Sequence, residues 1–162
     1  MRSHHVSRII AASPEAVYDF AADIGNLPKW AAGLAQSEVV REGHGLFVES
    51  PMGRVRIQFV ERNRFGVLDH DVVLPSGTTV TNPVRVLSHP DGAEVIFTVR
   101  QIELSEADFA RDIRMVEADL DRLAVLVTDR ATEAPNGKDG RPGAGCGRTG
   151  SAGEGPHGLP AR

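Results

Sequence analysis

The 162-residue sequence predicts an α+β domain in which a curved antiparallel sheet of about seven strands packs against one long C-terminal helix. Three observations lead to this prediction. A helix start signal follows the first strand, short strand-like runs separated by turn residues fill residues 37–103, and an apolar stripe of helical period comes last. Strands this close in sequence pair as hairpins, because parallel neighbours need a crossover of a dozen or more residues.

The N-terminal part predicts one strand followed by two short helices. Residues 6–11 form a β-branched run. Ser13-Pro14-Glu15 then predicts a helix start, with serine as the N-cap, proline at the first helical position and an acid near the positive end of the helix dipole. We expect Gly25-Asn26 to end this helix, and a shorter helix to run from Pro28 to about Gly33.

The middle of the chain predicts the rest of the sheet. Each gap between strand-like runs contains Gly, Pro, Asn or Asp, the residues that favour turns. The expected strands are residues 38–41, 46–49, 55–61, 67–74, 79–87 and 94–102.

The last folded element is expected to be a long amphipathic helix that begins after Ser105, its predicted N-cap. Its apolar residues recur at intervals of three and four, which places them on one face of a helix. They are Phe109, Ile113, Val116, Leu120, Leu123 and Val127.

Composition changes after Arg130 and predicts the end of the domain. Residues 131–162 hold nine of the 17 glycines and four of the ten prolines, with almost no aliphatic residue. Such a segment buries too little apolar surface to offset its chain entropy. We therefore expect one folded domain over residues 1–130 and a disordered Gly/Pro-rich tail over residues 131–162.

Charge and motif content exclude several function classes. The net charge of −4, with no Lys/Arg-rich block, argues against nucleic-acid binding. The single cysteine, Cys146, supports neither an internal disulfide nor a metal motif, and no phosphate loop or nucleophile elbow occurs. The N-terminus has no signal-peptide apolar run, and no stretch reaches the ~20 apolar residues of a membrane span. We expect a cytoplasmic protein without cofactor or metal.

Two segments, SPEAVYDFAADIGNLPKW (13–30) and GVLDHDVVLPSG (66–77), together with the long final helix, resemble the SRPBCC/START-like helix-grip superfamily. This group includes START domains, Bet v 1-like pollen allergens and bacterial polyketide cyclase/dehydrase-like proteins. The resemblance covers residues 3–129. It implies a helix-grip fold, in which the sheet wraps around the last helix and encloses an apolar cavity for a lipid, a polyketide or another small hydrophobic molecule.

The run Asp69-His70-Asp71 raises the question of a catalytic cluster. Successive side chains of a strand point to opposite faces, so the two carboxylates share one face, ~7 Å apart, and His70 faces away. This geometry does not suit a metal site. Burial of the aspartates would raise the pKa of their carboxyl groups and suit them to acid–base chemistry.

Which face points inward depends on the hairpin register. A two-residue Ser76-Gly77 loop would pair Asp71 with Asn82 and turn the aspartates toward the core. By the same scheme we expect Ile57 beside Asp69, and Val86 opposite Val95. A slip of one residue would reverse the assignment of this hairpin and bury His70 instead.

These considerations give two sets of candidate residues. The acid–base candidates are Asp69 and Asp71, for which a purely structural role is the alternative. The expected ligand-binding residues are Trp30, Phe59, Asp71, Asn82, Val84, Phe97, Phe109, Ile113 and Val116.

Three functions follow as hypotheses. The first is binding of a small hydrophobic molecule in the cavity. The second is a cofactor-free polyketide cyclase/dehydratase-like enzyme that uses Asp69 and Asp71. The third is a protein-interaction or stress-response adaptor. The sequence leaves a homodimer open and does not identify the ligand.

Overall fold

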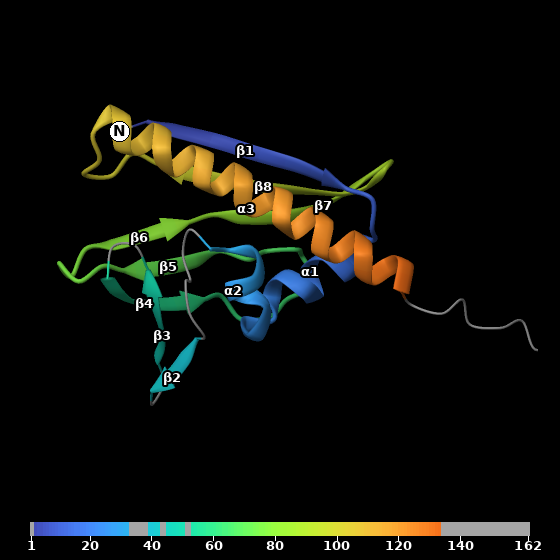
Figure 1. Cartoon of the computed structure of the whole chain (residues 1–162), viewed down its shortest axis with the longest axis horizontal. Coiled ribbons are helices and arrows are strands. Elements are labelled where there is room, and N and C mark those ends of the chain that lie inside the picture. Colours follow the sequence, from blue (N-terminus) through green and yellow to red (C-terminus); the bar gives the residue numbers. More distant parts are fainter. Residues whose placement is uncertain (1, 33–38, 43–44, 51–52, 134–162) are drawn as a thin grey trace, which may run out of the picture.

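The computed structural model describes residues 2–32, 39–42, 45–50 and 53–133 (Figure 1). Their elements are β1 (Ser3–Ile10), α1 (Pro14–Ala22), the 3-10 helix η1 (Ile24–Asn26), α2 (Leu27–Trp30), β2 (Val40–Glu42), β3 (Gly45–Ser50), β4 (Gly53–Phe59), β5 (His70–Val73), β6 (Thr79–Asn82), β7 (Val84–His89), β8 (Gly92–Arg100) and α3 (Glu106–Glu133). The predicted α+β order is confirmed.

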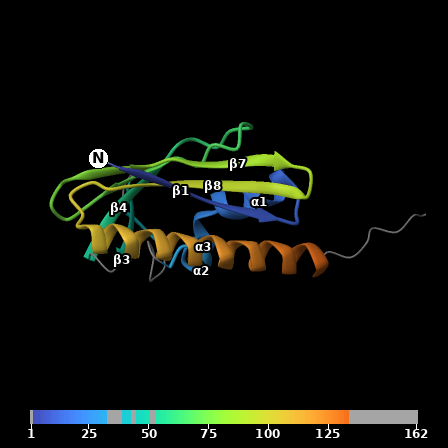
Figure 2. The same ribbon diagram turned by 90° about the horizontal axis from the view of Figure 1, so that it is seen from above.

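The sheet consists of two antiparallel parts that meet near the middle of the molecule. One part has the order β1-β8-β7 and the other the order β2-β3-β4-β5-β6. A bridge between Val67 and Arg85 links them. The helix α3 runs along one face of the first part, as Figures 1 and 2 show from two directions. This is the helix-grip arrangement expected from the sequence.

The described residues contain eight strands rather than about seven, because the run expected over residues 79–87 is divided at Pro83. Proline has no backbone N–H and therefore interrupts a strand ladder. The chain pairs with β5 before Pro83 and mainly with β8 after it. The break lets one stretch of chain belong to both parts of the sheet.

The predicted start of the first helix is confirmed, but α1 ends at Ala22, before the predicted end at Gly25-Asn26. The Ser13 side chain accepts a hydrogen bond from the Ala16 N–H at 3.2 Å, so serine is the N-cap of α1. The side chain of Asp23 then accepts from the Gly25 N–H and starts η1. Helix α2 begins at Leu27, one residue before the predicted start. Its predicted end near Gly33 lies outside the described residues.

Helix α3 begins as predicted, where the Ser105 hydroxyl accepts a hydrogen bond from the Asp108 N–H. It continues past the expected boundary at Arg130 to Glu133. Residues 134–162 lie outside the description, so the disordered tail stays a prediction. Five of the six predicted stripe residues are buried and Ile113 is half-buried; the five are Phe109, Val116, Leu120, Leu123 and Val127.

The register of the β5–β6 hairpin differs from the prediction by one residue. His70 pairs with Asn82, and Val72 with Val80. The reason is the loop: the Leu74 N–H donates to the Thr78 carbonyl at 2.9 Å, which leaves three loop residues instead of two. Gly77 completes this turn at φ +87°, the left-handed conformation typical of three-residue hairpin loops.

The register between β4 and β5 also differs from the prediction. Ile57 pairs with Val72 and Phe59 with His70, so the expected placement of Ile57 beside Asp69 is wrong. The expected pairing of Val86 with Val95 is confirmed. The structure therefore corresponds to the alternative register in which His70 points inward.

Candidate ligand cavity

A cavity of about 280 Å³ lies between α3 and the inner face of the sheet, with α2 at its side. Its wall is mainly apolar, which is the usual character of a small-molecule site. The apolar lining residues are Leu27, Trp30, Ala31, Val72, Leu74, Val80, Phe97, Ile102, Leu104, Met115 and Val116. The polar ones are His70, Asn82, Arg100, Asp108, Arg111, Asp112 and Asp119.

Strand geometry explains the contribution of β5 and the residue that follows it. His70, Val72 and Leu74 alternate along the chain and therefore share one face of the sheet. All three line the cavity. The intervening residues Asp71 and Val73 point to the opposite face. The three-residue hairpin loop thus determines which side chains of this segment reach the cavity.

Among the polar lining residues that come from the sheet, His70 is the most deeply buried, at 5% exposure. Its ring lies 5.0 Å from the Phe59 ring and 5.9 Å from the Phe97 ring, measured between centroids. Its Nδ1 lies 3.2 Å from the Leu68 carbonyl oxygen. Burial lowers the pKa of His70 below its ordinary value, despite that hydrogen bond and two nearby carboxylates. The imidazole is therefore neutral at pH 7.

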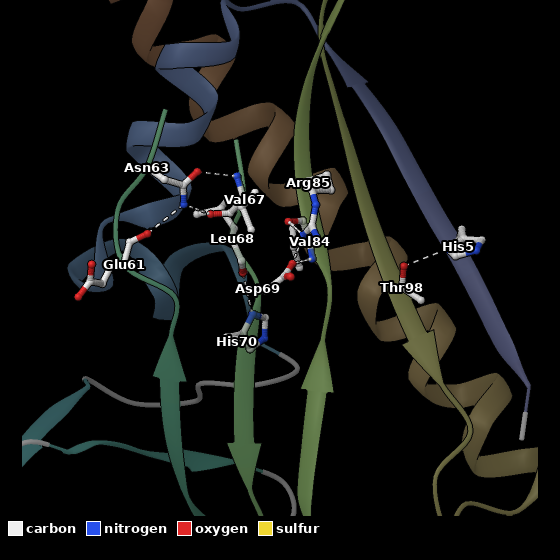
Figure 3. Close-up of polar contacts among 10 residues, drawn as sticks. All are labelled: His5, Glu61, Asn63, Val67, Leu68, Asp69, His70, Val84, Arg85 and Thr98. Carbon is white, nitrogen blue, oxygen red and sulfur yellow. Dashed lines mark hydrogen bonds and ion pairs between the residues drawn. The ribbon is translucent and has the colours of Figure 1, made fainter. Parts of the chain in front are cut away.

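Asp69 does not point into the cavity. Its carboxylate accepts the Val84 N–H at 2.8 Å and pairs with the Arg85 guanidinium on β7 (Figure 3). Partial burial opposes ionisation of Asp69, but the bonds from Arg85 and Val84 outweigh it and hold the pKa of this carboxyl below its usual value. The expected net rise of the pKa is therefore wrong for Asp69.

Asp71 also lies away from the lining residues. Its carboxylate accepts a hydrogen bond from the Thr81 hydroxyl at 2.6 Å. The prediction that both carboxylates face the core is wrong. The loop contains one more residue than expected, and this shifts the hairpin register by one residue, so that the two carboxylates point to the other face. Neither predicted acid–base residue is brought to the cavity.

The other predicted ligand-binding residues fall into three groups. Trp30, Asn82, Phe97 and Val116 line the cavity. Phe59 is not among the lining residues but packs against the His70 ring, with the two ring planes tilted by 38°. The remaining three pack within the core or against it and are not among the lining residues: Val84, Phe109 and Ile113.

Helix α3 contributes charged residues that the prediction omitted. Asp108 accepts a hydrogen bond from Arg111 at 2.6 Å, and Asp119 pairs with Arg122. Burial raises the pKa of the Asp112 carboxyl above its usual value, and nearby Arg111 only partly offsets this effect. A signal in the sequence could have identified Asp112. It lies three residues after Phe109 and four before Val116, and residues at these spacings share one face of a helix, so Asp112 lies on the face of the apolar stripe.

Arg122 also joins α3 to α2. Its Nε donates to the Trp30 carbonyl at 3.3 Å, while its Nη2 pairs with Asp119. The Trp30 side chain is buried, and its indole N–H has no hydrogen-bond partner in the described part of the chain. Trp30 is therefore held in the cavity wall by its backbone and its packing.

A second, more open hollow of about 670 Å³ lies between the α1–η1 segment and strands β2 and β3. Its lining includes four charged residues, Asp19, Asp23, Arg41 and Arg62. The smaller cavity is more enclosed and more apolar, and it lies where the resemblance places the ligand. We take the smaller cavity as the candidate site.

Comparison with known families agrees with this architecture. Residues 1–128 match the family described as polyketide cyclase / dehydrase and lipid transport. The chain belongs to this family. Among curated proteins no match is found. No helix in the described ranges is long and apolar enough to cross a membrane.

Solved structures show the same fold at low sequence identity. The protein XoxI from Bacillus cereus is 15% identical with a TM-score of 0.62, and the alignment covers 81% of this chain and 99% of that one. MLL2253 from Mesorhizobium loti is 13% identical with a TM-score of 0.62, at 80% and 98% coverage. Ara h 8.0201 is 9% identical with a TM-score of 0.58, at 79% and 98% coverage. The family and the partly enclosed, mainly apolar cavity together favour binding of a small hydrophobic molecule.

Proposed function

We propose that the protein binds a small, largely apolar molecule of the lipid or polyketide kind in the cavity between α3 and the sheet. The observation that carries the proposal is a partly enclosed cavity of about 280 Å³ whose mainly apolar wall is interrupted by several polar groups. Sites of this composition bind ligands through apolar contact and orient them through the polar groups.

Binding would stabilise the folded protein, because a ligand that binds only the native state adds free energy by mass action. At a ligand concentration one hundred times Kd the gain is about 2.7 kcal/mol. We expect a library of lipids and aromatic polyketides to contain compounds that raise the melting temperature. Native mass spectrometry of the purified protein would show any ligand that copurifies.

A matched pair of variants locates the binding. Val116 lines the cavity from α3, so Val116→Phe would fill part of it and weaken binding. Val125 lies on the same helix but is 59% exposed, so Val125→Phe should leave binding unchanged. Absence of any stabilising compound, or equal affinity of both variants for a compound that does bind, would contradict the proposal.

A polyketide cyclase- or dehydratase-like activity is the second candidate function. It is favoured by two titratable groups in the wall, the neutral imidazole of His70 and the carboxyl of Asp112, whose pKa is raised. These groups differ from the predicted pair, Asp69 and Asp71. A β-hydroxyketone probe tests the activity: formation of its enone should be lost in His70→Gln and Asp112→Asn and retained in Asp71→Asn. No enone formation by the wild-type protein would reject it.

A further inference from the structure

The cavity presents a hydrogen-bond acceptor at His70. A carbonyl oxygen can only accept a hydrogen bond, so the contact between Nδ1 and the Leu68 carbonyl places the proton on Nδ1. Since the imidazole is neutral, Nε2 carries a lone pair and no proton. Nε2 has no hydrogen-bond partner in the ranges that the structure describes, and the ring that carries it lines the cavity.

An acceptor without a partner favours a ligand that supplies a donor. Buried polar groups in native proteins are usually hydrogen-bonded, and leaving one unpaired is unfavourable. A hydroxyl group on a bound molecule would donate to Nε2 of His70. The indole N–H of Trp30 is also unpaired in the described residues, but it is too deeply buried for a molecule in the cavity to reach it.

The charged groups of the wall disfavour an anion near His70. Asp112 and Asp119 line the cavity from α3, opposite the strands. A neutral imidazole gives a buried carboxylate no counter-charge, and an unpaired buried charge is strongly unfavourable. Arg111 is already paired with Asp108, which leaves Arg100 as the lining cation with no ion pair in the described residues.

We propose that the ligand carries an uncharged hydroxyl group, alcoholic or phenolic, which donates to Nε2 of His70. This inference rests on the proposed function, since it names the class of molecule that the same cavity takes. A fatty acid or another carboxylate is the competing class, and it would bind through Arg100 instead.

Four probes with one ring system separate these classes: 2-naphthol, 2-methoxynaphthalene, naphthalene and 2-naphthoate. We expect titration calorimetry at pH 7.5 to show 2-naphthol binding at least tenfold more tightly than the other three, as the loss of one hydrogen bond predicts. His70→Phe keeps an aromatic ring in place and should abolish this preference while retaining 2-methoxynaphthalene. Asp71→Asn, which changes the neighbouring residue on the opposite face, should leave the preference intact.

A spectroscopic measurement on the wild-type protein avoids dependence on the variant. The ¹⁵N resonance of His70 Nε2 should shift when 2-naphthol is added and stay in place with 2-methoxynaphthalene. Equal affinity for 2-naphthol and 2-methoxynaphthalene would overturn the inference and leave the proposed function standing. Tighter binding of 2-naphthoate that is lost in Arg100→Gln would also overturn it. Binding of none of the four would contradict both this cavity as a binding site and the inference.

Discussion

Asp69 and Asp71 belong to one strand segment and share one face, yet the structure gives them very different roles. Asp69 lies opposite Pro83, where the ladder between the two parts of the sheet is interrupted. Its carboxylate accepts the N–H of Val84, a residue only 2% exposed, and pairs with Arg85. Asp71 contacts the exposed Thr81 hydroxyl. We predict that Asp69→Ala is strongly destabilising and that Asp71→Ala is not.

The size of the effect follows from these contacts. Removing the Asp69 carboxylate leaves the buried Val84 N–H without a partner, which costs about 1–3 kcal/mol. The ion pair adds only about 0.2–1 kcal/mol, because the Arg85 side chain is 40% exposed and screened by solvent. The sum for Asp69→Ala is about 1–4 kcal/mol. The exposed bond of Asp71 predicts about 0.5 kcal/mol for Asp71→Ala.

Urea denaturation at pH 7 measures both free energies of unfolding. Asp69→Asn is the informative intermediate, because its side-chain oxygen still accepts from Val84 while the charge is lost; we expect about 1 kcal/mol. The pKa of the Asp69 carboxyl lies below its ordinary value of 3.8, so its contribution is complete above that pH and is lost as the pH falls through the lowered value. Equal costs for Asp69→Ala and Asp71→Ala would refute this reasoning.

Three further predictions concern single residues. Burial lowers the pKa of His70 below 6.5, so at acidic pH the unfolded chain binds a proton that the folded chain does not. The urea concentration at the midpoint of unfolding should therefore fall as the pH drops below about 6.5. His70→Phe should flatten this part of the pH profile. Burial raises the pKa of Asp112 above 3.8, so its ionised form opposes folding at neutral pH; Asp112→Asn should raise the melting temperature at pH 7 but not at pH 4, and an equal change at both would count against this assignment. Gly66→Ala should cost more than 2 kcal/mol, because φ is +68° and an added Cβ would lie 2.0 Å from the Val86 carbonyl oxygen. Gly77→Ala, at φ +87° with nothing within 4 Å, should cost only about 1–2 kcal/mol by the same unfolding measurement, and similar costs for the two glycines would be inconsistent with the steric reason.

Local signals in the sequence were sufficient for most of the fold. Ser13 and Ser105 cap the helices that they were predicted to cap, because an N-cap depends on residues only two or three positions away. The apolar stripe of α3 was predictable for a similar reason, since its period depends on helix geometry alone. The Val86–Val95 pairing also agreed with the turn between β7 and β8.

The inward face of β5 was harder to predict, since it depends on one residue of loop length. Residues 75–77 fit either a two-residue loop at Ser76-Gly77 or a three-residue loop with Gly77 left-handed. Apolar counting favoured the two-residue loop, because Val73 and Val80 then share a face with Val67. That count treated Pro83 as an ordinary strand residue. The sequence also did not predict that Arg100 and Asp112 line the same cavity. Their positions depend on how α3 packs against β8, and a single sequence does not specify that packing.

The position of Trp30 gives the molecule an internal optical reporter. It is the only tryptophan in the chain, and it is 5% exposed at the wall of the cavity. Its backbone is tied through Arg122 to α3, so its emission comes from one site at the contact between the two structural units that enclose the cavity. The wavelength and intensity of that emission would register both the filling of the cavity and a separation of α2 from α3, without any label.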